Sequence, residues 1–160
     1  MNHAFQVPKR SVVADITLAG HTPVTLHLFL AEHSATRSGA ERPSDLLNGP
    51  ESFLPASDSE DRVVFLHRDA IVHLAVEAGA EFGGEGAGAE DLAPECAITA
   101  RVEVLLDNGH AITGELRYMM PEASRRLQDV LNQPRRFLTL RDGEQAQLIN
   151  KDHIVRVVPI

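Results

Sequence analysis

The sequence has no tryptophan, one tyrosine and one cysteine among its 160 residues. The lone cysteine, Cys96, excludes an intramolecular disulfide and a thiolate cluster for zinc or iron–sulfur. No apolar run approaches the roughly 18 residues of a membrane-spanning helix. The N-terminal residues also lack the apolar run and cleavage site of a secretory signal. We therefore expect a cytoplasmic protein with no membrane partner.

Basic residues are fewer than acidic ones, 15 against 23, which gives a formal net charge of −8. A chain with this balance has no general attraction to nucleic acid or anionic lipid. Six of the acids lie in residues 77–95, together with five of the eleven glycines and no periodic apolar pattern. This segment is predicted to be a flexible linker, and the chain on either side of it is closer to neutral.

An internal repeat organises the rest of the chain. Residues 42–50 (RPSDLLNGP) recur as residues 126–134 (RLQDVLNQP) at a spacing of 84, and residues 65–74 align with residues 148–157 at a spacing of 83. Several blocks in the same order predict two homologous units. The predicted division is an N-terminal arm (1–11), a first repeat unit (12–76), the linker (77–95) and a second repeat unit (96–160).

The second unit shows the clearer pattern of short strands. Apolar and polar residues alternate over 98–106 and again over 111–120, on either side of the hairpin signal Asp107-Asn108-Gly109. A short helix is predicted over 125–132, and further strands over 136–140, 145–149 and 154–158, with one helical turn before the last strand. The predicted class is mainly β with short helices.

Five short strands in each unit favour two small SH3-type barrels in tandem, because strong bending closes a small sheet and removes free edges. One mixed α+β domain with a continuous sheet is the alternative. Each unit is small and buries only a small core, so we expect the units to pack on each other or on neighbouring chains.

Part of the second unit resembles the Sm-like proteins. Residues 102–109 (VEVLLDNG), followed by Gly114-Glu115-Leu116, are similar to the first Sm motif, and residues 148–154 (LINKDHI) resemble the second. The resemblance implies a five-stranded Sm-like barrel. The RNA-binding loop of the family is replaced by residues 126–132, and Asn150-Lys151 stands where Arg-Gly is expected, so RNA binding does not carry over. The repeated Arg-x-x-Asp-x-Leu-Asn also looks like that of a group of functionally uncharacterised bacterial proteins.

Catalytic and metal-binding spacings are missing from the sequence. None of the eight histidines forms His-Glu-x-x-His or a pair spaced for one helix face or one strand face. The chain has no nucleophile elbow and no glycine-rich phosphate loop before a helix. We therefore predict a protein that is not an enzyme and that holds no metal or cofactor.

Four polar positions recur in both units. They are Arg42, Asp45, Asn48 and Asp69 in the first unit, and Arg126, Asp129, Asn132 and Asp152 in the second. The repeated carboxylates could form an acid–base pair. Their shared sequence context favours a structural role, such as capping the short helix and holding the turn before the last strand.

The second unit is locally basic. Its candidate residues for binding a partner or an anion are Arg125, Arg126, Arg135, Arg136 and Lys151. Aromatic platforms for stacking bases are scarce nearby, because only Tyr118 and Phe137 are close in sequence. The sequence therefore favours a protein-interaction or assembly protein, a scaffold or adaptor, that acts as a homo-oligomer or as a subunit of a larger complex. The alternative is an Sm-like RNA- or nucleotide-binding protein that uses this basic face.

Overall fold

The structure of the protein is a computed structural model, which describes residues 9–34, 39–83, 98–118 and 126–160. The strands of the first half are β1 (Lys9–Leu18), β2 (Val24–Ala31), β3 (Phe53–Ser57), β4 (Val63–His67) and β5 (Ile71–Glu77). Those of the second half are β6 (Ile98–Leu106), β7 (Ala111–Tyr118), β8 (Phe137–Asp142), β9 (Gln145–Asn150) and β10 (Ile154–Pro159). The short helices are α1 (Pro43–Leu47), α2 (Ala78–Phe82) and α3 (Leu127–Leu131), with 3-10 turns η1 (Arg68–Ala70) and η3 (Lys151–His153).

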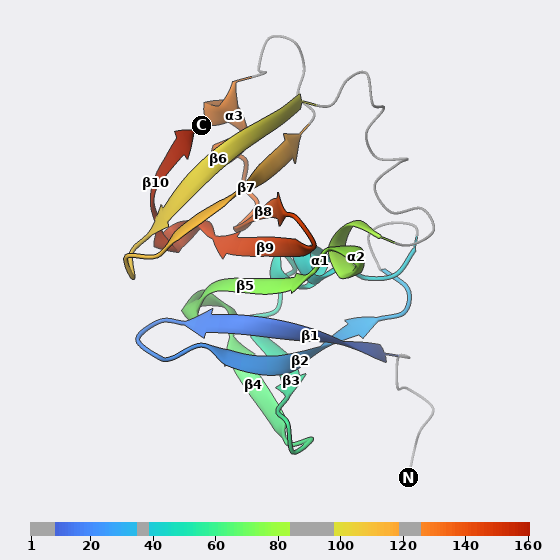
Figure 1. The fold of residues 1–160 in the computed structure, drawn as a ribbon. Coiled ribbons are helices and arrows are strands. Elements are labelled where there is room, and N and C mark those ends of the chain that lie inside the picture. Colours follow the sequence, from blue (N-terminus) through green and yellow to red (C-terminus); the bar gives the residue numbers. More distant parts are fainter. Residues whose placement is uncertain (1–8, 35–38, 84–97, 119–125) are drawn as a thin grey trace.

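All ten strands belong to one antiparallel sheet with the order β10-β6-β7-β8-β9-β5-β1-β2-β3-β4 (Figure 1). The predicted mainly β class is confirmed. The hydrogen bonding gives one open sheet that runs through both halves, so the division into two five-stranded barrels stays a prediction. None of the helices in the described ranges is long and apolar enough to cross a membrane.

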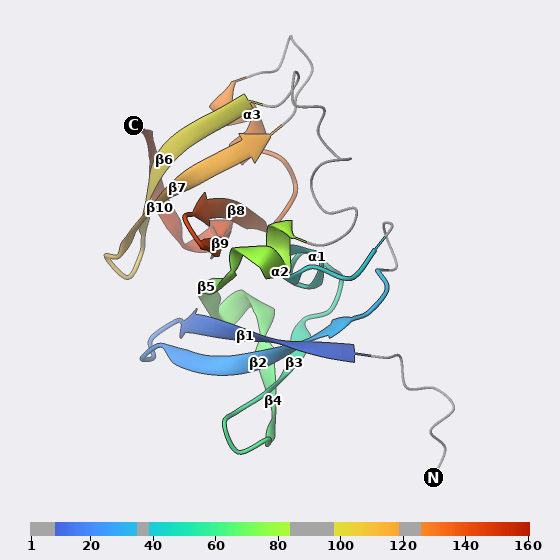
Figure 2. The same cartoon turned by 45° about the vertical axis from the view of Figure 1, so that its right-hand side comes forward.

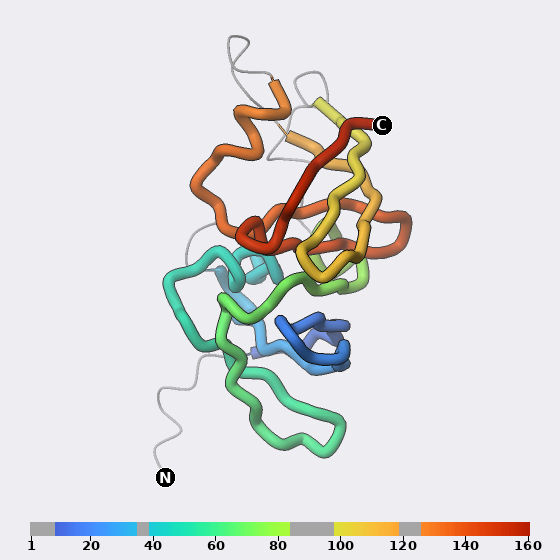
Figure 3. The backbone as a smooth tube through the Cα atoms, turned by 90° about the vertical axis from the view of Figure 1, so that its left-hand side faces the viewer, coloured from blue at the N-terminus to red at the C-terminus, as the bar shows by residue number. Residues whose placement is uncertain are grey.

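The strand order is the same in the two halves of the sheet. The first half reads β5-β1-β2-β3-β4, and the second reads β10-β6-β7-β8-β9. In each half the last strand lies beside the first strand. The two halves are stacked, with the first half, blue to green, at one end of the molecule and the second half, yellow to red, at the other (Figure 3).

Local sequence explains the individual strands. In β6, Val102, Val104 and Leu106 are buried while Thr99 and Arg101 are exposed, as the alternating pattern predicts. The turn into β7 needs a residue with positive φ, and Gly109 supplies it with φ of 85°. The other predicted strands and the short helix of the second unit are found within two residues of their predicted ends, apart from residues 119–125, which lie outside the described residues.

Regular secondary structure extends into the predicted linker and into the predicted arm. Glu77 is the last residue of β5, and Ala78–Phe82 forms helix α2, although both fall in the predicted linker. The helix is held by tertiary contacts that composition does not reveal: Phe82 packs against the first core, and Glu81 is buried. Residues 84–95 of the predicted linker lie outside the described residues. Strand β1 begins at Lys9, inside the predicted arm.

Two apolar cores lie against the sheet. The first core is formed mainly by the first half, including Ile16, Leu28, Leu54 and Leu74, and the second mainly by the second half, including Val102, Val104 and Leu140. The division is not strict at the middle of the sheet. Phe137, Ala146 and Leu148 of the second half belong to the first core, and Val72 of the first half belongs to the second. Strands β5 and β9 therefore contribute to both cores.

Candidate functional site

The two halves meet where β5 pairs with β9, a junction that we call the seam. The strands are antiparallel, with His73 opposite Ile149 and Glu77 opposite Gln145. They run side by side across the middle of the molecule, and α2 contacts both strands (Figure 2). Because the pairing is continuous with both halves of the sheet, the seam shows how one half of this chain binds the other.

Side chains reinforce the seam at its edges. Asn150 Nδ2 donates a hydrogen bond to the Ile71 carbonyl oxygen at 3.0 Å. The Phe137 N–H donates to Asn48 Oδ1 at 2.9 Å. Arg136 forms an ion pair with Asp69. Each of these contacts joins a residue of one half to a residue of the other, so the seam combines backbone pairing with specific polar bonds.

His153 adds a charged contact at the same junction. Its Nδ1 lies 2.7 Å from Asp107 Oδ2, and its Nε2 lies 3.1 Å from the carbonyl oxygen of Asp69 in the first half. Burial on its own lowers the pKa of His153. The hydrogen bonds to Asp107 and to the Asp69 backbone, with the negative charges of Asp107 and Asp152, outweigh burial and raise this pKa above its ordinary value of 6.5. Both ring nitrogens face acceptors, which suits the protonated imidazole.

Helix α2 is fixed to α1 by a buried carboxylate. Glu81 is buried, and its Oε2 accepts a hydrogen bond from the Ser44 N–H at 3.0 Å. Burial raises the pKa of Glu81 above its usual value, although the hydrogen bonds from Ser44 and the charge of Arg42 oppose that shift. The contact is internal to the first half, where it closes the end of the core beside the seam.

The outermost strands of the described sheet, β4 and β10, each have one edge without a partner strand. They lie at opposite ends of the molecule (Figures 1 and 3). We call them the free edges. An unpaired edge presents a row of backbone N–H and C=O groups that can bind another strand.

Large apolar side chains are exposed on the free edges, and Phe53 is exposed on β3 next to β4, although their repeat equivalents are buried at or beside the seam. Equivalent residues are separated by 84 positions from Arg42 to the turn between β3 and β4, and by 83 positions after that turn. The exposed fractions are 59% for Phe53 against 2% for Phe137, 60% for Val63 against 0% for Ala146, 67% for Phe65 against 0% for Leu148, and 64% for Val155 against 1% for Val72. The same positions are thus covered at the seam and uncovered at the two ends.

The predicted basic residues are engaged separately. Arg126 Nε lies 3.4 Å from Asp129 Oδ2, and Arg136 pairs with Asp69. Arg125 lies outside the described residues. Arg135 is exposed. Ion pairing within the chain reduces the charge that Arg126 and Arg136 present to an anion.

Lys151 forms hydrogen bonds within the protein, which its charge alone does not indicate. Its Nζ donates to the carbonyl oxygens of Leu131 and Gln133, at 3.0 and 2.9 Å, at the end of α3. Arg68, its repeat equivalent, donates to the Gly49 carbonyl oxygen at the end of α1. Both cations therefore bind carbonyl groups that a helix end leaves without intrahelical partners. The spacing of 83 was the sequence signal that relates them.

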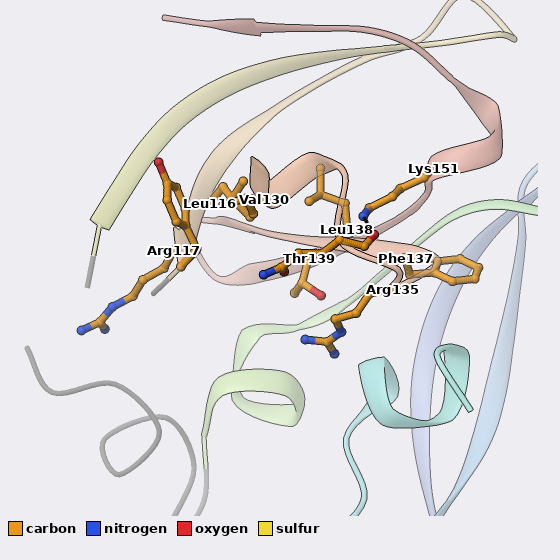
Figure 4. Close-up of a pocket in the computed structure, with 10 residues that line it drawn as sticks. Leu116, Arg117, Val130, Arg135, Phe137, Leu138, Thr139 and Lys151 are labelled. Atoms are coloured by element: carbon orange, nitrogen blue, oxygen red, sulfur yellow. Dashed lines mark hydrogen bonds between the residues drawn. The ribbon is translucent and has the colours of Figure 1, made fainter. Parts of the chain in front are cut away.

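Arg135 and Lys151 line a pocket of about 350 Å³ together with Arg117 (Figure 4). Its other lining residues are Leu116, Tyr118, Val130, Gln133, Phe137, Leu138 and Thr139. Burial, followed by the charge of Arg135, lowers the pKa of Lys151 from 10.5. In Figure 4 the guanidinium groups of Arg117 and Arg135 lie apart from each other and from the Lys151 amine. The three cations do not converge on one point.

The repeated polar residues make local and seam contacts. Asp45 Oδ2 accepts a hydrogen bond from the Arg42 N–H at 2.9 Å, at the start of α1. Asn48 Nδ2 donates to the Ser44 carbonyl oxygen at 2.9 Å, in addition to its bond with Phe137. Asp69 and Asp152 are the second residues of the two 3-10 turns, η1 and η3.

In each of these turns, the side chain of the residue that precedes the turn accepts a hydrogen bond from the aspartate N–H. His67 Nδ1 accepts from Asp69 and Asn150 Oδ1 accepts from Asp152, both at 3.1 Å. The sequence did not predict the contact between Asn48 and Phe137. The asparagine is repeated in both units, and this repetition does not indicate that its partner lies in the other unit.

Within the described ranges, no group of three or more His, Cys, Asp or Glu side chains is arranged to hold a metal ion. No protein-family model, no curated protein and no solved structure matches this chain.

Proposed function

We propose that this chain is a non-enzymatic assembly protein, a scaffold whose tandem units join copies of the chain through the free edges. Each half of the sheet is a small SH3-type or Sm-like barrel in this proposal. The identical strand order of the two halves supports this subdivision, since each half keeps its last strand beside its first.

One observation carries the proposal. The exposed apolar side chains Phe53, Phe65 and Val155 have equivalents that are buried at the seam. Burying a large apolar side chain is worth about 1.5–3 kcal/mol. A strand that covered these edges would therefore contribute the same kind of burial free energy that the seam contributes within the chain. Contiguous exposed apolar surface beside an unpaired strand edge is typical of an interaction site.

Nucleic-acid binding has less support. Lys151 binds helix-end carbonyls, and Arg126 and Arg136 pair with aspartates. An RNA-binding face needs cations that are available to phosphate and aromatic rings that are available to bases. The three cations that line the pocket of the second unit, Arg117, Arg135 and Lys151, lie apart from one another.

The mass of the full chain in solution, measured by light scattering across a concentration series, tests the proposal. We expect an oligomer that Phe65→Asp converts to a monomer, because the variant places a carboxylate on the edge. Val13→Asp is the matched control, because Val13 is 54% exposed but lies on β1 inside the sheet. A wild-type monomer at every concentration, or an oligomer equally lost in both variants, contradicts the proposal.

A further inference from the structure

We infer that β10 of one copy pairs with β4 of a second copy in the register of the internal seam. This inference rests on the proposed function and deepens it by naming the strands, their direction and their register. It starts from the strand order. Strand β9 holds the same place in the second half as β4 holds in the first, and β10 holds the same place as β5. The seam pairs β5 with β9. The equivalent pairing, of β10 with β4, is not formed within the described sheet, because these strands lie at its two ends.

The side chains at the two free edges fit this junction. On β9, Ala146 and Leu148 point out of the second core and enter the first core across the seam. Their equivalents on β4, Val63 and Phe65, are exposed, while the intervening Val64 packs partly against the first core. Strand β4 therefore presents to solvent the face that β9 presents to its neighbour.

The same holds for the partner strand. On β5, Val72 points out of the first core and enters the second. Its equivalent on β10, Val155, is 64% exposed, while Ile154 and Val157 pack partly against the second core. In the proposed junction Val155 enters the first core of the next copy, and Phe53, Val63 and Phe65 of that copy cover the second core. Each free edge thus supplies apolar side chains that cover the core beside the other free edge.

A polar contact is available at the same place. At the seam, Asn48 accepts the hydrogen bond of the Phe137 N–H. The equivalents are Asn132, which is exposed at the end of α3, and Phe53 at the start of β3. Asn132 of one copy is thus positioned to accept from the Phe53 N–H of the next. The seam therefore specifies the polar partner as well as the apolar ones.

The spacing of 83 converts the seam register into a register for the junction. At the seam Leu74 is opposite Leu148, Ala75 is opposite Gln147, and Val76 is opposite Ala146. Moving each residue by 83 positions places Val157 opposite Phe65, Val158 opposite Val64, and Pro159 opposite Val63. These pairs define the junction residue by residue.

The junction is expected to be weaker than the seam. Pro159 has no N–H, so the hydrogen-bond ladder along β10 loses a donor there. Ser52 occupies the position of Arg136, so the ion pair of Arg136 with Asp69 has no counterpart. Because the two free edges are different strands, the contact is head to tail, and repeated contacts give a ring if the rotation closes and a filament if it does not.

Disulfide trapping tests the register. In a Cys96→Ser background, a Val158→Cys protein is mixed with a Val64→Cys protein and oxidised, while light scattering reports the mass of the mixture. Residues directly opposite in antiparallel strands lie at the distance that a disulfide spans. The matched control is the seam pair Ala75→Cys with Gln147→Cys in one chain. The offset control mixes Val158→Cys with Phe65→Cys, whose side chains point to opposite faces of the sheet.

We expect an internal disulfide in the seam control, an intermolecular disulfide between positions 158 and 64, and several times less product in the offset mixture. Oligomers that give no 158–64 product, or as much offset product, overturn the proposed register while the assembly function stands. A monomeric mass at every concentration overturns both.

Discussion

Asn48 and Phe137 are joined across the seam by a 2.9 Å hydrogen bond, from the Phe137 N–H to Asn48 Oδ1. The same asparagine also binds the Ser44 carbonyl oxygen within its own half. Its repeat equivalent, Asn132, occupies the same helix-end position but is exposed. One repeated residue thus has a partner at the seam in one unit and faces solvent in the other.

Replacing these two asparagines is expected to have different effects. Asn48→Ala leaves the Phe137 N–H without its acceptor, so we expect the free energy of unfolding to fall by about 1–3 kcal/mol. Asn132→Ala is expected to leave this free energy nearly unchanged and to raise the concentration at which the chain assembles. Urea unfolding of dilute protein and light scattering measure the two quantities. Equal losses of stability in the two variants would contradict the distinction.

The bond between His153 and Asp107 predicts a pH dependence of stability. The pKa of His153 is raised in the folded protein, so the folded state holds its proton more tightly than the unfolded state. This contribution to stability is fully present below the ordinary pKa of 6.5 and is lost as the pH rises through the folded-state pKa. The His153 contribution to the urea midpoint should therefore decrease from below pH 6.5 to mildly alkaline pH. His73, whose pKa is lowered mainly by burial, contributes in the opposite direction, so the His153 part is identified by comparison with a variant of its partner.

Asp107→Asn is the control for that pH series. The amide keeps a hydrogen-bonding oxygen but removes the negative charge that favours the imidazolium. The decrease in the urea midpoint is expected to become shallower and to move to lower pH. An unchanged pH profile in this variant would show that other groups are responsible.

Gly114 marks the closest approach of β7 to β8. A Cβ atom at this position would lie 2.9 Å from the Arg141 carbonyl oxygen and 3.0 Å from Leu140 Cβ. Because the backbone of β8 has to move, Gly114→Ala is expected to lower the free energy of unfolding by about 1–3 kcal/mol. In Gly79→Ala the new Cβ meets nothing within 4 Å, and alanine favours helix α2. Thermal melts of the two variants should therefore shift in opposite directions, and a neutral Gly114→Ala would refute the close approach.

Local patterns explain what the sequence could predict. The alternation over 98–106 and the Asn108-Gly109 turn depend on neighbours in the chain, and the corresponding strands are found. The environments of Phe53 and Phe137 could not be predicted in this way. Both phenylalanines precede leucine and follow the same repeated motif, and only their place in the sheet decides that Phe137 is covered.

Tertiary contacts explain the remaining differences. Residues 78–82 have the composition of a linker, but Glu81 and Phe82 find buried partners and the segment is helical. Lys151 is a candidate anion ligand by charge, yet its amine faces two helix-end carbonyls. In both cases the deciding atoms are far away in sequence, where neither composition nor periodicity carries information.

The exchange of side chains at the seam ties the two halves together thermodynamically. Removing the second half would take Phe137, Ala146 and Leu148 out of the first core, and removing the first half would take Val72 out of the second. Such losses expose the remaining core to water, which costs about 25 cal/mol for each Å² of apolar surface uncovered. A chain whose sequence reads as two units is therefore expected to melt as one cooperative unit, in a single transition whose calorimetric and van't Hoff enthalpies agree.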